Sequence, residues 1–212
     1  TSISPIPADS LSFTMPIGPC ITDQTAANFN AGTVDATTSV VTDGDGAVIL
    51  SPAVNEQFSG SSIPAGWNEG IWDGQSGTAT TYGGGQVSVN GTHLSTAATF
   101  GIGASVEFYA TYTAGNFQNV GFTADADFNA PWVVIGRGAA GDNNVYARSS
   151  DGHTDILGTN LLNAAHKFRI QWTSANTFQF YVDDILVATP NITINGGANM
   201  NIQISDYPAG GV

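Results

Sequence analysis

Aromatic and polar side chains that could bind a sugar recur at alternating positions of several short segments. An aromatic ring can stack on the apolar face of a pyranose, while carboxylate, amide and guanidinium groups orient its hydroxyls. Alternation puts Glu107 and Tyr109 on one side of a strand, and Tyr146 and Arg148 on one side of another. A core position is the alternative for a tryptophan such as Trp132. The candidate sugar-binding residues are Glu107, Tyr109, Trp132, Tyr146, Arg148 and Tyr181.

Short acidic turns offer a second kind of site. Calcium takes about six to eight oxygen ligands from carboxylates, carbonyls and amides, and loops of Asp, Asn and Gly supply all three. Such loops occur at Asp43-Gly-Asp45-Gly and at Asp125-Ala-Asp127. We therefore expect a structural Ca²⁺ as a candidate cofactor, with solvated turn aspartates as the alternative.

Other catalytic chemistry has less support in the sequence. A Ser/His/Asp hydrolase would need His93, His153 or His166, but there is no Gly-x-Ser-x-Gly motif. The histidines and the single cysteine, Cys20, do not have zinc-ligand spacing. We therefore expect a structural role for His166.

The charge balance excludes whole classes of partner. Only 10% of the 212 residues are charged, against about 25% in ordinary domains. Acidic residues outnumber basic ones 17 to 4, which gives a net charge of -13. Such a chain repels nucleic-acid phosphates, and its four cations cannot form a polybasic patch for anionic membranes. No apolar run reaches the length of a membrane span.

The composition favours a secreted or cell-surface protein. The sequence begins at Thr1 without a methionine and is rich in Thr, Ser, Asn and Gly, with almost no Lys. We therefore expect an exported protein from which a leader has been removed.

The elements that must position these residues are short strands separated by turns. Apolar and polar residues alternate along residues 104–112, 166–172 and 177–182, and no long segment keeps a helical period. Strands of this kind, apolar on one side only, predict an all-β fold of two packed antiparallel sheets, a sandwich or jelly roll. The domains expected are a proline-rich extended arm (1–20), a short β segment packing on the main domain (21–53), and the sandwich (54–212).

Several of these segments resemble the concanavalin A-like lectin and glucanase superfamily, as found in exported bacterial proteins. Residues 166–172 (His-Lys-Phe-Arg-Ile-Gln-Trp) and 178–189 (beginning Phe-Gln-Phe-Tyr-Val-Asp-Asp) look like a hairpin typical of that superfamily. The resemblance extends over roughly residues 54–207. The other segments that carry it are 58–67, 117–122, 131–132, 145–148 and 205–207.

The resemblance implies a jelly roll and raises three further expectations. Members often hold a calcium ion near an acid at the end of the chain, which here is Asp206. A final strand would follow the Ser-Asp-Tyr segment at 205–207, so this strand is either missing or supplied by another subunit. Glycosidases of the superfamily carry Glu-x-Asp-x-Glu on a strand, whereas the nearest match here is Glu107-Phe-Tyr109-Ala-Thr111.

These observations rank three functions. The leading interpretation is a non-catalytic carbohydrate-binding or adhesion module, with a polysaccharide as its partner. The alternative is a self-assembling subunit of an extracellular filament, sheath or surface layer, joined to its own copies by strand exchange. A polysaccharide hydrolase or lyase comes third.

Overall fold

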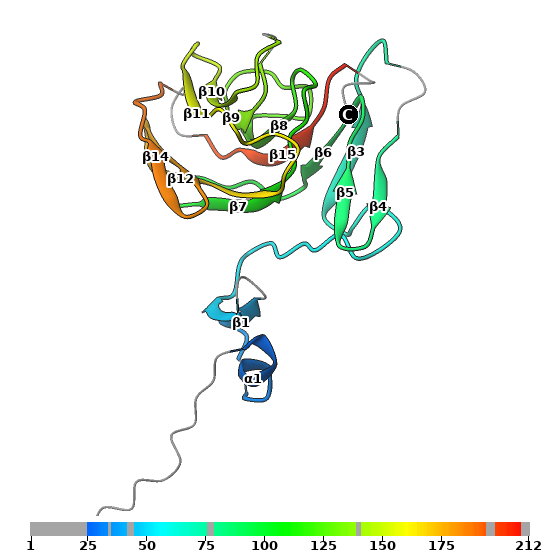
Figure 1. Ribbon diagram of the computed structural model, residues 1–212, viewed down its shortest axis with the longest axis vertical. Coiled ribbons are helices and arrows are strands. Elements are labelled where there is room, and N and C mark those ends of the chain that lie inside the picture. The colour runs from blue at the N-terminus through cyan, green and yellow to red at the C-terminus, as the bar shows by residue number, and fades with distance from the viewer. Residues whose placement is uncertain are drawn as a thin grey trace, which may run out of the picture. The chain divides into compact units, whose positions relative to one another are not determined.

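The structure is a computed structural model that describes residues 25–33, 35–41, 45–75, 79–138, 141–193 and 198–208. The chain divides into two compact units, Thr1–Asn55 and Glu56–Val212 (Figure 1). The proline-rich arm expected at 1–20 and Asp43 lie outside the described residues. No helix in the described ranges is long and apolar enough to cross a membrane.

The described part of the first unit contains one short helix and one hairpin. Helix α1 (Ala26–Asn30) begins after Thr25, whose hydroxyl oxygen accepts a hydrogen bond from the Asn28 N–H at 3.2 Å. Strands β1 (Thr38–Val41) and β2 (Ala47–Leu50) pair antiparallel. None of the residues of α1, β1 or β2 is buried within this unit.

The second unit is built from two antiparallel sheets. Its larger sheet consists, in spatial order, of β11 (Thr154–Gly158), β10 (Val145–Ser149), β9 (Trp132–Gly136), β8 (Asn119–Thr123), β15 (Asn201–Ser205), β6 (Thr92–Thr96) and β3 (Trp67–Ile71). Its smaller sheet consists of β14 (Ile185–Ala188), β13 (Thr177–Val182), β12 (His166–Ser174) and β7 (Ser105–Ala110). A separate hairpin joins β4 (Thr81–Gly83) and β5 (Gln86–Ser88).

The core lies between the two sheets, which form separate layers in Figure 1. Phe168, Ile170 and Trp172 alternate along β12 and are fully buried, as their spacing predicts. From the larger sheet, Phe122 and Val133 meet them in the same cluster. The all-β, two-sheet sandwich predicted from the sequence is therefore confirmed.

The larger sheet has a second, outward face that is polar. The pairing registers place Gly136, Asn119, Ser205 and His93 in one row across β9, β8, β15 and β6. Because neighbouring residues of a strand point to opposite faces, these side chains face away from the core. Yet Asn119, Ser205 and His93 are only 5%, 3% and 7% exposed. Loops must therefore cover part of this face.

The position of the core predicts that two isoleucines contribute differently to the free energy of unfolding. Ile170→Ala removes a fully buried side chain and should lower the free energy of unfolding by about 2–5 kcal/mol. Ile185→Ala, the same change at a residue that is 66% exposed, should cost less than about 1 kcal/mol. Urea unfolding of both variants measures the difference, and equal losses would contradict this assignment of the core.

Candidate functional site

A closed circuit of six side chains lies over the outward face of the larger sheet, and we call it the aromatic rim. Trp132 and Arg148 occupy outward positions of β9 and β10, and loops supply the other members. The rim runs from Trp72 to Phe128 (6.3 Å between ring centroids), Trp132 (5.2 Å), the Arg148 guanidinium (5.6 Å), Phe117 (5.9 Å) and Tyr207 (6.3 Å), and back to Trp72 (6.2 Å).

Two members of the rim have a strained backbone. Phe117 has a φ of 54° and Phe128 a φ of 62°, both in the left-handed region that bulky residues rarely adopt. Such conformations persist only where the surrounding structure imposes them, and they are frequent at binding and catalytic sites. The strain therefore supports a functional role for the rim.

The polar side chains near the rim leave buried atoms without hydrogen-bond partners. These atoms are His93 Nδ1, Thr123 Oγ1, Gln203 Oε1 and the Nε1 of Trp72. A buried donor or acceptor without a partner costs about 1–3 kcal/mol. An ordered internal water would supply the missing partners.

A cavity of about 320 Å³ adjoins the rim at Trp72 and Tyr207. His93 lies in its wall with its ring 4.6 Å from that of Trp72. Burial lowers the pKa of His93, although the charges of Asp127 and Glu69 act in the opposite direction, so the imidazole is neutral at neutral pH. The residues that line the cavity are Ile71, Trp72, Asp73, His93, Asp127 and Tyr207.

Local geometry holds His93 and Asp127 in place. Gly70 faces His93 across β3 and β6, and a Cβ at this position would lie 2.3 Å from His93 Nε2, so only glycine leaves room for the imidazole. The Asp125 carboxylate accepts hydrogen bonds from the N–H groups of Asp127 (3.0 Å) and Asn129 (3.1 Å). Burial raises the pKa of Asp125, but the hydrogen bond from the Asn129 side-chain amide (3.0 Å), together with these two, outweighs it and lowers the pKa overall.

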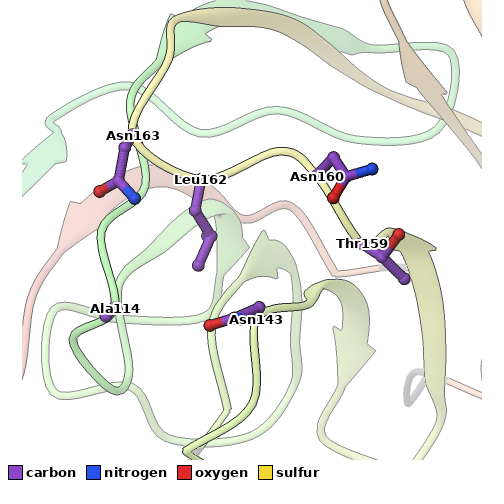
Figure 2. Close-up of a pocket in the computed structure, with 6 residues that line it drawn as sticks. All are labelled: Ala114, Asn143, Thr159, Asn160, Leu162 and Asn163. Atoms are coloured by element: carbon purple, nitrogen blue, oxygen red, sulfur yellow. The ribbon is translucent and has the colours of Figure 1, made fainter.

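A second cavity, of about 290 Å³, lies among loops that follow β7, β9 and β11 (Figure 2). Its lining contains no titratable side chain, so it offers no acid or base for catalysis. The residues that line it are Ala114, Asn143, Thr159, Asn160, Leu162 and Asn163.

The six residues predicted to bind sugar are divided between two faces of the sandwich. Trp132 and Arg148 belong to the rim, and Tyr146 shares their face, where its hydroxyl donates to the Asp142 carboxylate. The other three, Glu107, Tyr109 and Tyr181, lie on the outward face of the smaller sheet.

The smaller sheet's outward face has no free aromatic ring at Tyr181, because the Arg169 guanidinium lies 3.8 Å from the centre of that ring. The six predicted residues therefore do not form a single patch. The residues of the site that were not predicted are Trp72, Asp73, His93, Phe117, Phe128 and Tyr207.

Comparison with solved structures identifies the fold. A β-agarase A in complex with oligoagarose has a TM-score of 0.51 and 13% identity, over 70% of this chain and 77% of that chain. A prokaryotic β-1,3-1,4-glucanase (lichenase) derived from a mouse hindgut metagenome has a TM-score of 0.52 and 17% identity, over 74% and 86%. This is the concanavalin A-like jelly-roll fold. The Crh5 transglycosylase has a TM-score of 0.50 and 14% identity, over 80% of this chain and 68% of that one.

No protein-family model and no curated protein matches the chain. The jelly-roll structures nevertheless correct the leading functional prediction. Because they are an agarase, a lichenase and a transglycosylase, the interpretation as a non-catalytic binding or adhesion module without enzymatic activity is wrong. The polysaccharide hydrolase becomes the leading candidate, and the filament subunit stays a prediction. At these low identities the likeness establishes the fold, so the activity has to be argued from the site.

The strands of the described jelly roll do not carry a pair of carboxylates. Glu69, Glu107 and Asp155 lie on three different strands, β3, β7 and β11. On the central strands β8 and β9 the outward positions hold Asn, Gly, Thr, Trp and Val. The acids of the cavity, Asp73 and Asp127, therefore come from loops that follow β3 and β8.

The predicted calcium ligands that the structure describes belong to different segments of the chain. Asp45 belongs to the first unit, Asp125 and Asp127 to the loop after β8, and Asp206 follows β15. Within the described ranges, no group of three or more His, Cys, Asp or Glu side chains could hold a metal ion. Calcium binding through Asp206 stays a prediction.

Asp206 is a buried carboxylate with unusual surroundings. It is 1% exposed, and neither carboxylate oxygen has a well-aligned hydrogen-bond partner among the described residues. Burial raises its pKa to about 6, although the Gly91 N–H acts to lower it. A proton would neutralise this charge.

The raised pKa of Asp206 predicts that the stability of the folded protein depends on pH. Since the folded protein binds this proton more tightly than the unfolded chain, stability falls as pH rises from about 4 to about 6. At pH 8 in a chelator, Asp206→Asn should therefore increase the free energy of unfolding, by up to about 2–3 kcal/mol. If Asp206 binds calcium, millimolar Ca²⁺ should stabilise the native sequence and not the variant. Denaturant titrations at pH 4 and pH 8 measure both effects, and a pH-independent difference would contradict the pKa assignment.

Proposed function

We propose that this protein hydrolyses a polysaccharide, which lies along the aromatic rim and is cleaved in the adjoining cavity. The observation that carries the proposal is the composition of that cavity. Two carboxylates, Asp73 and Asp127, and the buried His93 line a space bounded by the rim residues Trp72 and Tyr207. Glycoside hydrolysis needs two acid groups near the scissile bond and apolar surfaces that bind the sugar rings, and this cavity has both.

The rim suits a sugar chain. Its rings offer apolar faces for pyranose C–H groups. A polymer too large to cross a membrane also agrees with the secreted or cell-surface location expected from the composition. Carbohydrate binding by the agarase, seen with oligoagarose, supports a glycan as the partner.

The chemistry requires two acid groups with different roles. One carboxylic acid protonates the glycosidic oxygen as its bond to the anomeric carbon breaks. The other, as a carboxylate, either attacks that carbon or removes a proton from the attacking water. Asp73 and Asp127 are the candidates for these roles, and His93 lies in the wall of the same cavity.

Release of reducing ends from agarose, mixed-linkage β-1,3-1,4-glucan and laminarin tests the proposal. Asp73→Asn and Asp127→Asn should each lower turnover by about 100-fold or more, because an amide cannot act as acid, base or nucleophile. The matched control is Asp184→Asn, which changes an exposed turn residue that pairs with Lys167.

Two results would overturn the proposal: no product from any of these polymers, or full turnover in both cavity variants. With an active polymer, the anomeric configuration of the first product, followed by NMR, distinguishes direct attack by the carboxylate from attack by water.

A further inference from the structure

Arg148 is a half-buried cation at the aromatic rim. Its guanidinium lies 5.6 Å from the ring of Trp132 and 5.9 Å from that of Phe117, so it contacts two aromatic rings. Such contacts hold a guanidinium in place while leaving its N–H groups free to bind acceptors.

The donors of Arg148 are largely unused. Nη1 donates to the Arg137 carbonyl at 2.9 Å and to Asn119 Oδ1 at 3.5 Å. No ion pair joins Arg148 to an acid in the described part of the chain. A guanidinium has five N–H donors, and its planar fork matches carboxylate and sulfate oxygens.

The acids nearest in sequence, Asp151 and Asp142, are already engaged, and Asp151 accepts the N–H groups of His153 (3.3 Å) and Thr193 (2.8 Å). Asp142 pairs with Arg137 at 3.4 Å, accepts the Asn144 N–H at 3.0 Å, and also accepts the Tyr146 hydroxyl. Of the other cations, Lys167 pairs with Asp184 at 2.8 Å, and Arg169 covers Tyr181 on the smaller sheet. Arg148 is therefore the cation whose open donors lie at the rim.

We infer that Arg148 binds an anionic group of the polysaccharide, either a uronate carboxylate or a sulfate ester, and selects chains that carry one. This inference rests on the proposed function, because it assigns the substrate class of the same site. The other charges of the protein limit how densely the substrate can be charged. Asp73 and Asp127 line the cavity adjoining the rim, and the chain carries a net charge of -13. The substrate must therefore have neutral residues between its charged ones, since a uniformly charged chain would be repelled.

Equilibrium binding to matched oligosaccharides tests the inference, in an Asp127→Asn background that prevents cleavage. One pair is agarose oligosaccharides without and with sulfate esters. The other is glucan oligosaccharides that are neutral or have glucuronate at alternate residues. In one of the two pairs the anionic member should bind at least about tenfold more tightly at low salt, and this ratio should shrink as salt increases. The pair that shows the preference identifies the anionic group.

Three variants distinguish recognition by the planar guanidinium from attraction by positive charge alone. Arg148→Met should abolish the anionic-to-neutral ratio, and Arg148→Lys should keep only part of it, because lysine retains the charge without the planar fork. Arg169→Met should leave the ratio unchanged, although it removes the same charge from the same kind of aromatic contact on the other sheet. Thermal unfolding of each variant verifies folding, and if Arg148→Met does not fold, the ratio for Arg148→Lys decides.

The two proposals fail in different ways. If neutral and anionic probes bind equally, or the ratio survives Arg148→Met, the anionic preference is wrong while the hydrolase proposal stands. Absence of both oligosaccharide binding and polymer hydrolysis would overturn the proposed function itself.

Discussion

Apolar contact between the two sheets is the interaction on which the rest of the molecule depends. Trp172 lies at its centre, with its ring stacked on Phe178 of β13 at 5.2 Å and edge-on to Phe122 of β8 at 5.8 Å. Its indole N–H donates to the Ser174 carbonyl at 2.8 Å, so burial leaves no polar atom of this side chain unpaired. Because strand residues alternate between faces, burying this side of β8 and β9 turns their other residues outward, toward the rim.

Several features of the outward face of the larger sheet destabilise the fold, and the packing of the core offsets them. This face holds buried polar atoms without partners, at His93, Thr123 and Gln203, and left-handed backbones at Phe117 and Phe128. Each such feature costs on the order of 1 kcal/mol or more. Their concentration on one face, opposite a well-packed core, sets this face apart from the rest of the sandwich.

Electrostatics divides this face into regions of opposite sign. Asp73 and Asp127 line the cavity beside Trp72, whereas Arg148 lies between Trp132 and Phe117. A glycan that spans both regions must present a scissile bond to the acids and an acceptor to the guanidinium. Arg148 attracts anions only in its immediate surroundings, because the chain has a net charge of -13 and its acids repel anions elsewhere.

The sequence alone determined the fold class and the composition of each strand face. Period-two alternation at Phe168, Ile170 and Trp172 is a local property, so it could be predicted without knowing which strands pair. The same reasoning found Trp132 and Arg148 but grouped them with Glu107 and Tyr181, because alternation does not say to which sheet a strand belongs.

Only the tertiary structure separated these residues and assembled the site. Trp72, Phe128 and Tyr207 come from loops far apart in the sequence, and they meet because β3, β8 and β15 share one sheet. Their meeting depends on long-range strand order and on loop backbones with positive φ, neither of which has a local signature in the sequence. The same physical reason explains why Asp73 escaped prediction and why Asp127 was predicted only as a calcium ligand: the pairing of strands, and not their spacing along the chain, brings both acids to one cavity.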